Sequence, residues 1–289
     1  LTVECDGAGN VDDLNDWLTN NGGAIASDDC SAITWTNDFT KLADACGATG
    51  SATVTFTATD GCGNSSTTTA IFTIEDITAP TIDAEASDLT VECDGAGNIA
   101  DLNNWLNSNG GAIASDLCGN VTWTNDFTEL SDLCGATGSA TVTFTATDDC
   151  GNFSTTTAIF TIEDTLNPVI STVAADQTVQ CDGSGNTDEL QAWLDTQAGA
   201  VAIDQCSTIT WTNNYSGLLD QCGATGRALV TFTATDECGN SSSTTALFTI
   251  LDLLNPTIDT EASDLTVECD GAGNVDDLND WLTNNGGAI

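Results

Sequence analysis

The chain repeats a unit of 88 residues without insertion or deletion. Its cysteines fall into four series with this step, beginning at Cys5, Cys30, Cys46 and Cys62, and three prolines and four tryptophans keep the same step. Self-similarity at a fixed period is the signature of a tandem array. We therefore predict three repeats and part of a fourth. They are residues 1–79, which lack the first strand and linker, then 80–167, 168–255 and the partial repeat 256–289.

The four cysteines of each unit predict disulfide bonds. A unit of this size buries only a modest fraction of its surface and gains stability from covalent cross-links. An even number of cysteines in a small repeated domain is typical of disulfides and of an oxidising, extracellular compartment. The competing interpretation is a zinc site, but the chain has no histidine and its cysteines are spaced by 25, 16 and 16 residues rather than as CxxC pairs.

Alternation of apolar residues with threonines predicts β-strands. In SATVTFTATD, Val54, Phe56 and Ala58 share one face and threonines share the other, as in a half-buried strand. TTTAIFTIED has the same period, and the glycines between the two segments predict a hairpin. We expect a mostly β fold of immunoglobulin-like β-sandwich repeats arranged end to end as a fibre. The strands expected in the first unit and the next linker are 1–5, 32–37, 51–59, 67–75 and 81–86.

One segment of each unit predicts a short helical insertion. In NVDDLNDWLTNNGG, Leu14, Trp17 and Leu18 recur at i, i+3 and i+4, and Asn10 and Asp13 occupy the positions of a capping box. We expect the helix to cover one end or edge of the sandwich, with Trp17 in the core.

Strand directions predict how the cysteines pair. If strands 32–37 and 67–75 run antiparallel to strand 51–59, Cys30 and Cys62 lie at one end of the repeat. If the repeats are strung end to end, Cys5 and Cys46 lie at the other end. Sequence alone allows three connectivities, and this geometry favours two bridges inside each repeat. The predicted bridges are Cys5–Cys46, Cys30–Cys62, Cys93–Cys134, Cys118–Cys150, Cys181–Cys222 and Cys206–Cys238.

The same geometry gathers carboxylates where one repeat meets the next. Calcium takes six to eight oxygen ligands, often carboxylates from separate loops, and would offset the repulsion and stiffen the array. Against this, no stretch has the spacing of an EF-hand, and some clustering arises by chance in so acidic a chain. The predicted calcium ligands are Glu75, Asp76, Asp88, Asp116 and Asp148 at the first boundary, and Glu163, Asp164, Asp176, Asp204 and Asp236 at the second.

The charge of the chain limits its partners. It has 44 acidic residues against Lys41 and Arg227, for a formal net charge of −42. Repulsion of this strength excludes nucleic acid and anionic membranes as electrostatic partners and favours bound or condensed cations. The alternative is that the charge only keeps a long fibre soluble.

Catalysis is not expected from these residues. No histidine is present, and no serine lies in a nucleophile elbow or near a base. We therefore expect no enzyme and no cofactor other than calcium. The sequons at Asn64, Asn152 and Asn240 lie on the predicted hairpin turn and fit N-glycosylation.

The motif TVTFTATDxCGN, followed by TTTAxFTIxD and a proline linker, resembles the hyalin-repeat-like, immunoglobulin-like domains of giant cell-surface proteins of Bacteroidota. Gliding-motility adhesins of the SprB type are similar in character. The resemblance covers every repeat. It implies export by the type IX secretion system, attachment at the outer membrane through a C-terminal region outside this sequence, and service as a long filament or stalk.

Two functions of different classes remain open. One is a structural extracellular array, forming a stiff, acidic, disulfide-stapled surface filament or adhesin stalk of a bacterium in adhesion or gliding motility. The alternative is a calcium-dependent binding module in which each repeat engages glycan, a surface or a neighbouring fibre. The expected partners are neighbouring repeats of the same chain, other copies in a fibre, and surfaces or polysaccharide. The expected location is the cell surface, with no membrane insertion by this segment.

Overall fold

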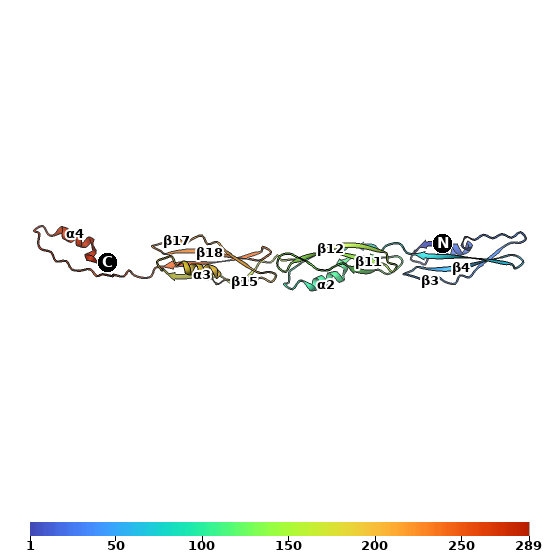
Figure 1. Cartoon of the computed structure of the whole chain (residues 1–289), viewed down its shortest axis with the longest axis horizontal. Helices are drawn as coiled ribbons and strands as arrows, with labels where there is room; N and C mark the ends of the chain where they lie inside the picture. Colours follow the sequence, from blue (N-terminus) through green and yellow to red (C-terminus); the bar gives the residue numbers. More distant parts are fainter. Residues whose placement is uncertain (289) are drawn as a thin grey trace. The chain divides into compact units, whose positions relative to one another are not determined.

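The computed structural model describes residues 1–288, and Figure 1 labels helices and strands along the chain. These residues divide into two compact units. The first unit contains residues 1–169 together with the segments 203–210 and 234–242 of the third repeat. The second unit contains the remaining described residues. The first two repeats and two loops of the third therefore form one compact body.

The second repeat contains a complete set of elements. They are β6 (Thr81–Ala84), β7 (Leu89–Glu92), α2 (Ile99–Asn107), η2 (Asn109–Gly111), β8 (Ile113–Ser115), β9 (Thr122–Asn125), β10 (Ser131–Asp132), β11 (Gly138–Thr147) and β12 (Phe153–Glu163). Five strands form one sheet in the order β10–β11–β12–β7, with β9 also paired to β11, and β6 pairs with β8 in a second sheet.

The other repeats carry corresponding elements in the same order. In the first repeat, residues 25–27 correspond to β8 but form no strand, since the described residues 1–79 contain no counterpart of β6 to pair with. The elements of the first repeat are β1 (Thr2–Glu4), α1 (Val11–Thr19), η1 (Asn21–Gly23), β2 (Thr34–Asn37), β3 (Ala43–Asp44), β4 (Gly50–Thr59) and β5 (Ser65–Glu75). Those of the third are β13 (Val169–Thr172), β14 (Gln177–Gln180), α3 (Thr187–Asp195), η3 (Gln197–Gly199), β15 (Val201–Ile203), β16 (Thr210–Asn213), β17 (Leu219–Asp220), β18 (Gly226–Thr235) and β19 (Ser241–Leu251), followed by α4 (Val275–Thr283) and η4 (Asn285–Gly287).

A long hairpin organises each sheet. Strands β11 and β12 pair antiparallel from Gly138 opposite Ile162 to Thr147 opposite Phe153. Strand β9 is antiparallel to β11, and β7 is parallel to β12. The strand directions predicted from the sequence are therefore confirmed, including the shared direction of the first and last strands of a repeat.

The core of each repeat lies between the inward face of this hairpin and the helix. In the second repeat, Val142, Phe144 and Phe160 are fully buried. The ring of Trp105 on α2 lies 5.2 Å from that of Phe144, nearly perpendicular to it. Burial of each such side chain contributes roughly 1.5–3 kcal/mol to folding. The prediction of a mostly β sandwich with a short helix plugging its core is confirmed.

The residue that precedes each helix has a left-handed backbone, which the sequence did not predict. Asn98, the residue before α2, has a left-handed backbone with φ of 48°, as does its counterpart Asn10. The predicted N-cap position is confirmed and Asn98 does contact Asp101, its predicted capping partner, through Nδ2 to Oδ2 at 3.3 Å. The capping-box bonds themselves do not form, because the Asn98 side chain accepts from no backbone N–H of the helix. Its amide Nδ2 donates to the backbone oxygen of Glu92 at 2.9 Å, and its Oδ1 accepts from the backbone N–H of Asp94 at 3.1 Å. The side chain therefore ties the helix to strand β7.

Substitution of Asn98 tests this tie. Asn98→Ala leaves the Glu92 oxygen without this donor and keeps a Cβ at a left-handed position without the side-chain bonds that hold it there, so we expect the free energy of local opening of α2 to fall by about 2–4 kcal/mol. The matched variant Asn98→Gly loses the same hydrogen bonds but keeps the backbone freedom, and we expect its loss to be smaller by about 1 kcal/mol. Hydrogen exchange of the Leu102 amide, which donates to the Asn98 oxygen, measures both. Equal exchange in the wild type and Asn98→Ala would contradict the assignment.

Candidate functional site at the repeat junctions

Cysteines from successive repeats meet at a shared boundary, which we call a junction. Cys5 follows β1, and its Cα lies 6.1 Å from that of Cys118 in a loop of the second repeat, to which it is disulfide-bonded. Cys46 is bonded to Cys150 with a Cα separation of 5.1 Å. The second junction has the equivalent bonds Cys93–Cys206 and Cys134–Cys238. Each junction thus carries two disulfides, and each links one repeat to the next.

The predicted pairing inside repeats is therefore wrong. The bonds Cys5–Cys46, Cys93–Cys134, Cys118–Cys150 and Cys206–Cys238 do not form, because their members bond across the junctions. The members of the remaining predicted pairs, Cys30–Cys62 and Cys181–Cys222, form no disulfide within the described residues, and neither does Cys269. The prediction placed the cysteines by strand direction, and β1 and β5 do run in the same direction, as expected. It failed in assuming that each repeat closes on itself.

Backbone contact between repeats explains the observed pairing. The N–H of Ala48, in the loop after Cys46, donates to the backbone oxygen of Cys118 at 2.6 Å. Gly47 has φ of 54° and lies so close to this oxygen that any Cβ would collide with it. The next repeat therefore packs backbone to backbone against the loop and brings Cys118 to Cys5.

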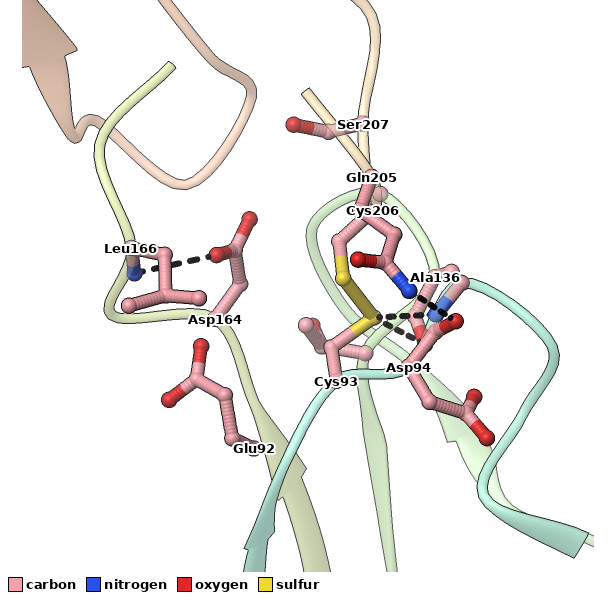
Figure 2. Close-up of a disulfide and its surroundings, with 12 residues drawn as sticks. Glu92, Cys93, Asp94, Ala136, Asp164, Leu166, Gln205, Cys206 and Ser207 are labelled. Carbon is pink, nitrogen blue, oxygen red and sulfur yellow. Dashed lines mark hydrogen bonds between the residues drawn. A yellow bond between two sulfur atoms is a disulfide. The ribbon is translucent and has the colours of Figure 1, made fainter. Parts of the chain in front are cut away.

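The second junction has the same backbone contact. Ala136 N–H donates to the oxygen of Cys206 at 2.7 Å, and Gly135 leaves the room for it. The side-chain amide of Gln205 donates to the oxygen of Asp94 at 2.7 Å, beside the Cys93–Cys206 bond (Figure 2). The backbone bond and its glycine recur at both junctions, whereas the Gln205 bond does not, because Leu117 holds the equivalent position at the first junction.

One disulfide of each junction, Cys5–Cys118 or Cys93–Cys206, belongs to the core of a repeat. Cys5 and Cys118 are only 6% and 5% exposed, and Cys118 packs in one cluster with Trp17 and Phe56 of the preceding repeat. Cys206 occupies the same place in the core of the second repeat. The two bonds of a junction span 113 and 104 residues, and the chain-entropy account of cross-linking values a loop of this size at about 4–5 kcal/mol of stability. Each junction therefore continues the core of the repeat before it.

Three aspartates converge at each junction. Asp76 in the linker, Asp116 two residues before Cys118, and Asp148 two residues before Cys150 each place a carboxylate oxygen within 4.8 Å of the others. Asp164, Asp204 and Asp236 do the same at the second junction. We call these the first and second aspartate clusters. The sequence predicted all six residues, and the structure brings them together as two sets of three.

The other four predicted ligands lie outside the clusters. Asp88 Oδ1 accepts from the backbone N–H of Ile159 at 2.8 Å, and Asp176 makes the same bond to Leu247. Glu75 and Glu163 are exposed at the ends of β5 and β12. These residues were predicted from chain direction alone, which places a residue at one end of a repeat but does not fix where its side chain points.

Sequence reasoning also missed a residue beside each cluster. Glu4 accepts hydrogen bonds at Oε1 from Ile77 N–H and the Thr78 hydroxyl, so its carboxylate fastens the linker next to Asp76. Glu92 binds Thr165 in the same way at the second junction. The available signal was the glutamate immediately before the first cysteine of these two repeats, in the motif VEC.

The linker aspartates, Asp76 and Asp164, each have a carboxylate oxygen without a hydrogen-bond partner among the described residues. Each residue is 9% exposed, and the unpaired oxygen is the buried Oδ2 atom. Burial raises the pKa of Asp76, and the neighbouring charges of Asp116, Asp148 and Glu4 raise it further. The pKa of Asp164 is raised by burial and by its own three acidic neighbours.

The hairpin aspartate behaves in the opposite way. Burial opposes ionisation of Asp148, but hydrogen bonds from the side chain and backbone of Asn152 and from Cys150 N–H outweigh it and lower its pKa.

The three carboxylates of a cluster repel one another when they are charged. Two unit charges 4.8 Å apart repel by on the order of 3 kcal/mol at an effective dielectric constant of 20. No lysine or arginine occurs between residues 42 and 226 to offset this repulsion.

Each cluster borders a cavity. The first has a volume of about 260 Å³ and is lined by Asp76 and Asp116 with Glu4, Thr78 and Ser115 among other residues. The second, about 370 Å³, is lined by Asp164, Asp204 and the Cys93–Cys206 disulfide, and Figure 2 shows Asp164 and this disulfide. Carboxylate, hydroxyl and carbonyl oxygens are the ligands that hard cations such as Ca²⁺ take. The residues present thus fit a hard divalent cation.

Two of the three sequon asparagines, Asn152 and Asn240, are part of a junction. Asn152 Nδ2 donates to the backbone oxygen of Asp76 at 3.0 Å and to Asp148 Oδ2 at 2.9 Å, and Asn240 makes the equivalent bonds. A glycan on this nitrogen would replace one of the two donated hydrogens. Asn64 makes only the bond to its own aspartate, Asp60. Glycosylation stays a prediction at all three asparagines.

Comparisons with known proteins return structural likeness only. No protein-family model and no curated protein match the chain. Solved structures that align with it include mouse clustered PcdhgC3 EC1-3 (12% identity, TM-score 0.25, 71% of this chain and 77% of that one) and Drosophila N-cadherin EC1-4 (12%, 0.27, 69% and 57%). The human Desmocollin-1 ectodomain aligns at 12% identity with a TM-score of 0.25, over 70% of this chain and 48% of that one. Likeness at this level assigns no function to the chain.

Among the described residues, no helix has the length and apolar character needed to cross a membrane.

Cleavage of the linker tests the pairing across the first junction. With a site-specific protease sequence in place of residues 77–79, we expect the cut protein to migrate as one species without reductant and as two fragments with it, because two disulfides hold the fragments together. The control that carries Cys118→Ser and Cys150→Ser should separate without reductant. Separation of the cut parent protein under non-reducing conditions would restore the pairing inside repeats.

Proposed function

We propose that the chain is a load-bearing segment of an extracellular repeat array, in which disulfides between successive repeats limit how far the chain extends under force. The observation that carries the proposal is that all four disulfides join one repeat to the next and that their loops overlap. A bridge inside a repeat protects only that repeat, whereas overlapping bridges create a continuous covalent route that bypasses most of the backbone.

The length of that route can be counted. It enters at Cys5, crosses to Cys118, follows the backbone for 16 residues to Cys134 and crosses to Cys238. The backbone itself runs through 233 residues between Cys5 and Cys238. Even complete loss of the fold would therefore leave the distance between these two cysteines short. This property suits a tether or stalk that must keep its length while it transmits tension.

The cysteine usage supports the location. Disulfides in such density persist in oxidising, extracellular surroundings. The resemblance of the hairpin motif to surface proteins of Bacteroidota leads us to place the array at a bacterial cell surface, exported by type IX secretion, as a filament or adhesin stalk that serves adhesion or gliding motility. Its partners would be neighbouring repeats of the same chain and other copies in a fibre. We propose no enzymatic activity for it.

A second candidate is a calcium-dependent binding module that engages glycan, a surface or a neighbouring fibre. The two aspartate clusters favour it, because they are repeated, partly buried and without a cationic side chain. The two candidates differ in a direct observation. A purified three-repeat fragment adheres by itself to polysaccharide or surfaces in the presence of calcium if the second is correct, and does not adhere if the array is only a stalk.

Force spectroscopy tests the load-bearing function. We expect reduction to lengthen the fully extended chain by the 217 residues that the disulfides bypass, which is about 700–800 Å at 3.3–3.6 Å per residue. The variant Cys134→Ser with Cys238→Ser forces a longer route and should show an intermediate extension when oxidised. Bridges inside repeats would leave a route of about 110 residues between Cys5 and Cys238. An oxidised length corresponding to that route would refute the proposal.

A further inference from the structure

We propose that each aspartate cluster binds one divalent cation, with Ca²⁺ as the best match, and that the ion joins the linker of one repeat to the two disulfide-bearing loops of the next. The inference specifies the site on which the second candidate function rests. It concerns the ion alone, so it stands or falls separately from any adhesion to glycan.

The buried, unpaired oxygen of the linker aspartate points to a ligand. Asp76 is nine-tenths buried, its Oδ1 accepts from Thr78 N–H at 3.2 Å, and its Oδ2 has no donor among the described residues. Asp164 repeats this arrangement, with Leu166 N–H as the donor to Oδ1. Buried polar atoms are almost always paired, and an exception at the same place in two repeats requires an explanation. A cation supplies the missing partner.

The loops hold the other carboxylates in place for an ion. Asp116 Oδ1 accepts from Cys118 N–H, and Asp148 Oδ1 accepts from the N–H groups of Cys150 and Asn152. Backbone hydrogen bonds thus fix the orientation of each carboxylate at the cluster, while further oxygens of the cavity and water complete the coordination. A flexible shell of six to eight oxygens is the arrangement of Ca²⁺, whereas Mg²⁺ requires a near-ideal octahedron and keeps its water.

The third linker aspartate provides an internal control. Asp252 holds the position equivalent to Asp76 and Asp164, but it is exposed and belongs to neither cluster. If a linker aspartate alone were enough to bind an ion, Asp252 would bind one too. If binding requires that a linker aspartate meet two aspartates of the next repeat, the described chain has two sites.

The experiment is a calcium titration of the oxidised 289-residue chain by isothermal titration calorimetry in 150 mM monovalent salt, with magnesium titrated in parallel. We expect two sites, one site in Asp76→Asn, no site above background in Asp76→Asn with Asp164→Asn, and two sites in Asp252→Asn. Asparagine keeps the Oδ1 acceptor for Thr78 or Leu166, so these variants retain the linker bond while losing the charge. Non-reducing mass analysis confirms that each variant keeps its four disulfides.

A second readout separates a specific site from the cation atmosphere of an acidic chain. Hydrogen exchange of the Cys118 and Cys150 amides should slow at least tenfold with calcium in the wild type and in Asp252→Asn, and the slowing should vanish in Asp76→Asn. No saturable binding up to millimolar calcium would overturn the proposal. Binding whose stoichiometry is unchanged in the double variant would overturn it as well. Adhesion to glycan can be absent while both readouts hold, in which case only the second candidate function fails.

Discussion

The backbone contact of Cys118 with the loop of the preceding repeat is the constraint on which the junction depends. Because Gly47 has no side chain, the oxygen of Cys118 reaches the Ala48 N–H, and this approach places the sulfur of Cys118 beside Cys5 in the core of the preceding repeat. A larger residue at Gly47 would separate the two backbones and leave the cysteine without its partner. The covalent chemistry of the array therefore follows from a packing contact.

The same approach forces the carboxylates together. Asp116 and Asp148 lie two residues before the cysteines that bond across the junction, and the linker brings Asp76 to them. A junction closed by disulfides cannot relax by moving these charges apart. Burial first, and then this repulsion, raises the pKa of Asp76, and a bound cation would offset both. The disulfides and the proposed ion sites are thus two consequences of one arrangement.

Local features of the fold could be predicted because they depend on local patterns. The threonine alternation around Phe56 identified the hairpin, and the spacing of Leu14, Trp17 and Leu18 identified the helix and its buried tryptophan. The pairing of Asn10 with Asp13 was found, but the bonds of a capping box were not, because the left-handed backbone of Asn10 directs its amide to Asp13 Oδ2 and to the backbone oxygen of Glu4.

The disulfide pairing could not be predicted from the sequence for a different reason. In a strict repeat, Cys30 and Cys118 have equivalent surroundings in sequence, so the pattern does not distinguish a bond inside a repeat from one to its neighbour. The pairing depends on the close approach of the next repeat's backbone to Gly47 and Gly135, which exists only when two repeats pack together. The six cluster aspartates were found because the ends of the strands were assigned correctly, whereas Glu4 and Glu92 were missed because their role depends on the course of the linker.

Disulfide mapping of the intact protein by mass spectrometry tests the central claim most directly. The second junction is the better target, because residues 1–25 and 265–289 are identical and peptides containing Cys5 and Cys269 cannot be told apart. Pairing between repeats predicts peptides in which Cys93 is joined to Cys206 and Cys134 to Cys238. Recovery of Cys93 joined to Cys134 would contradict the account, since each repeat would then close on itself and the covalent route through the array would not exist.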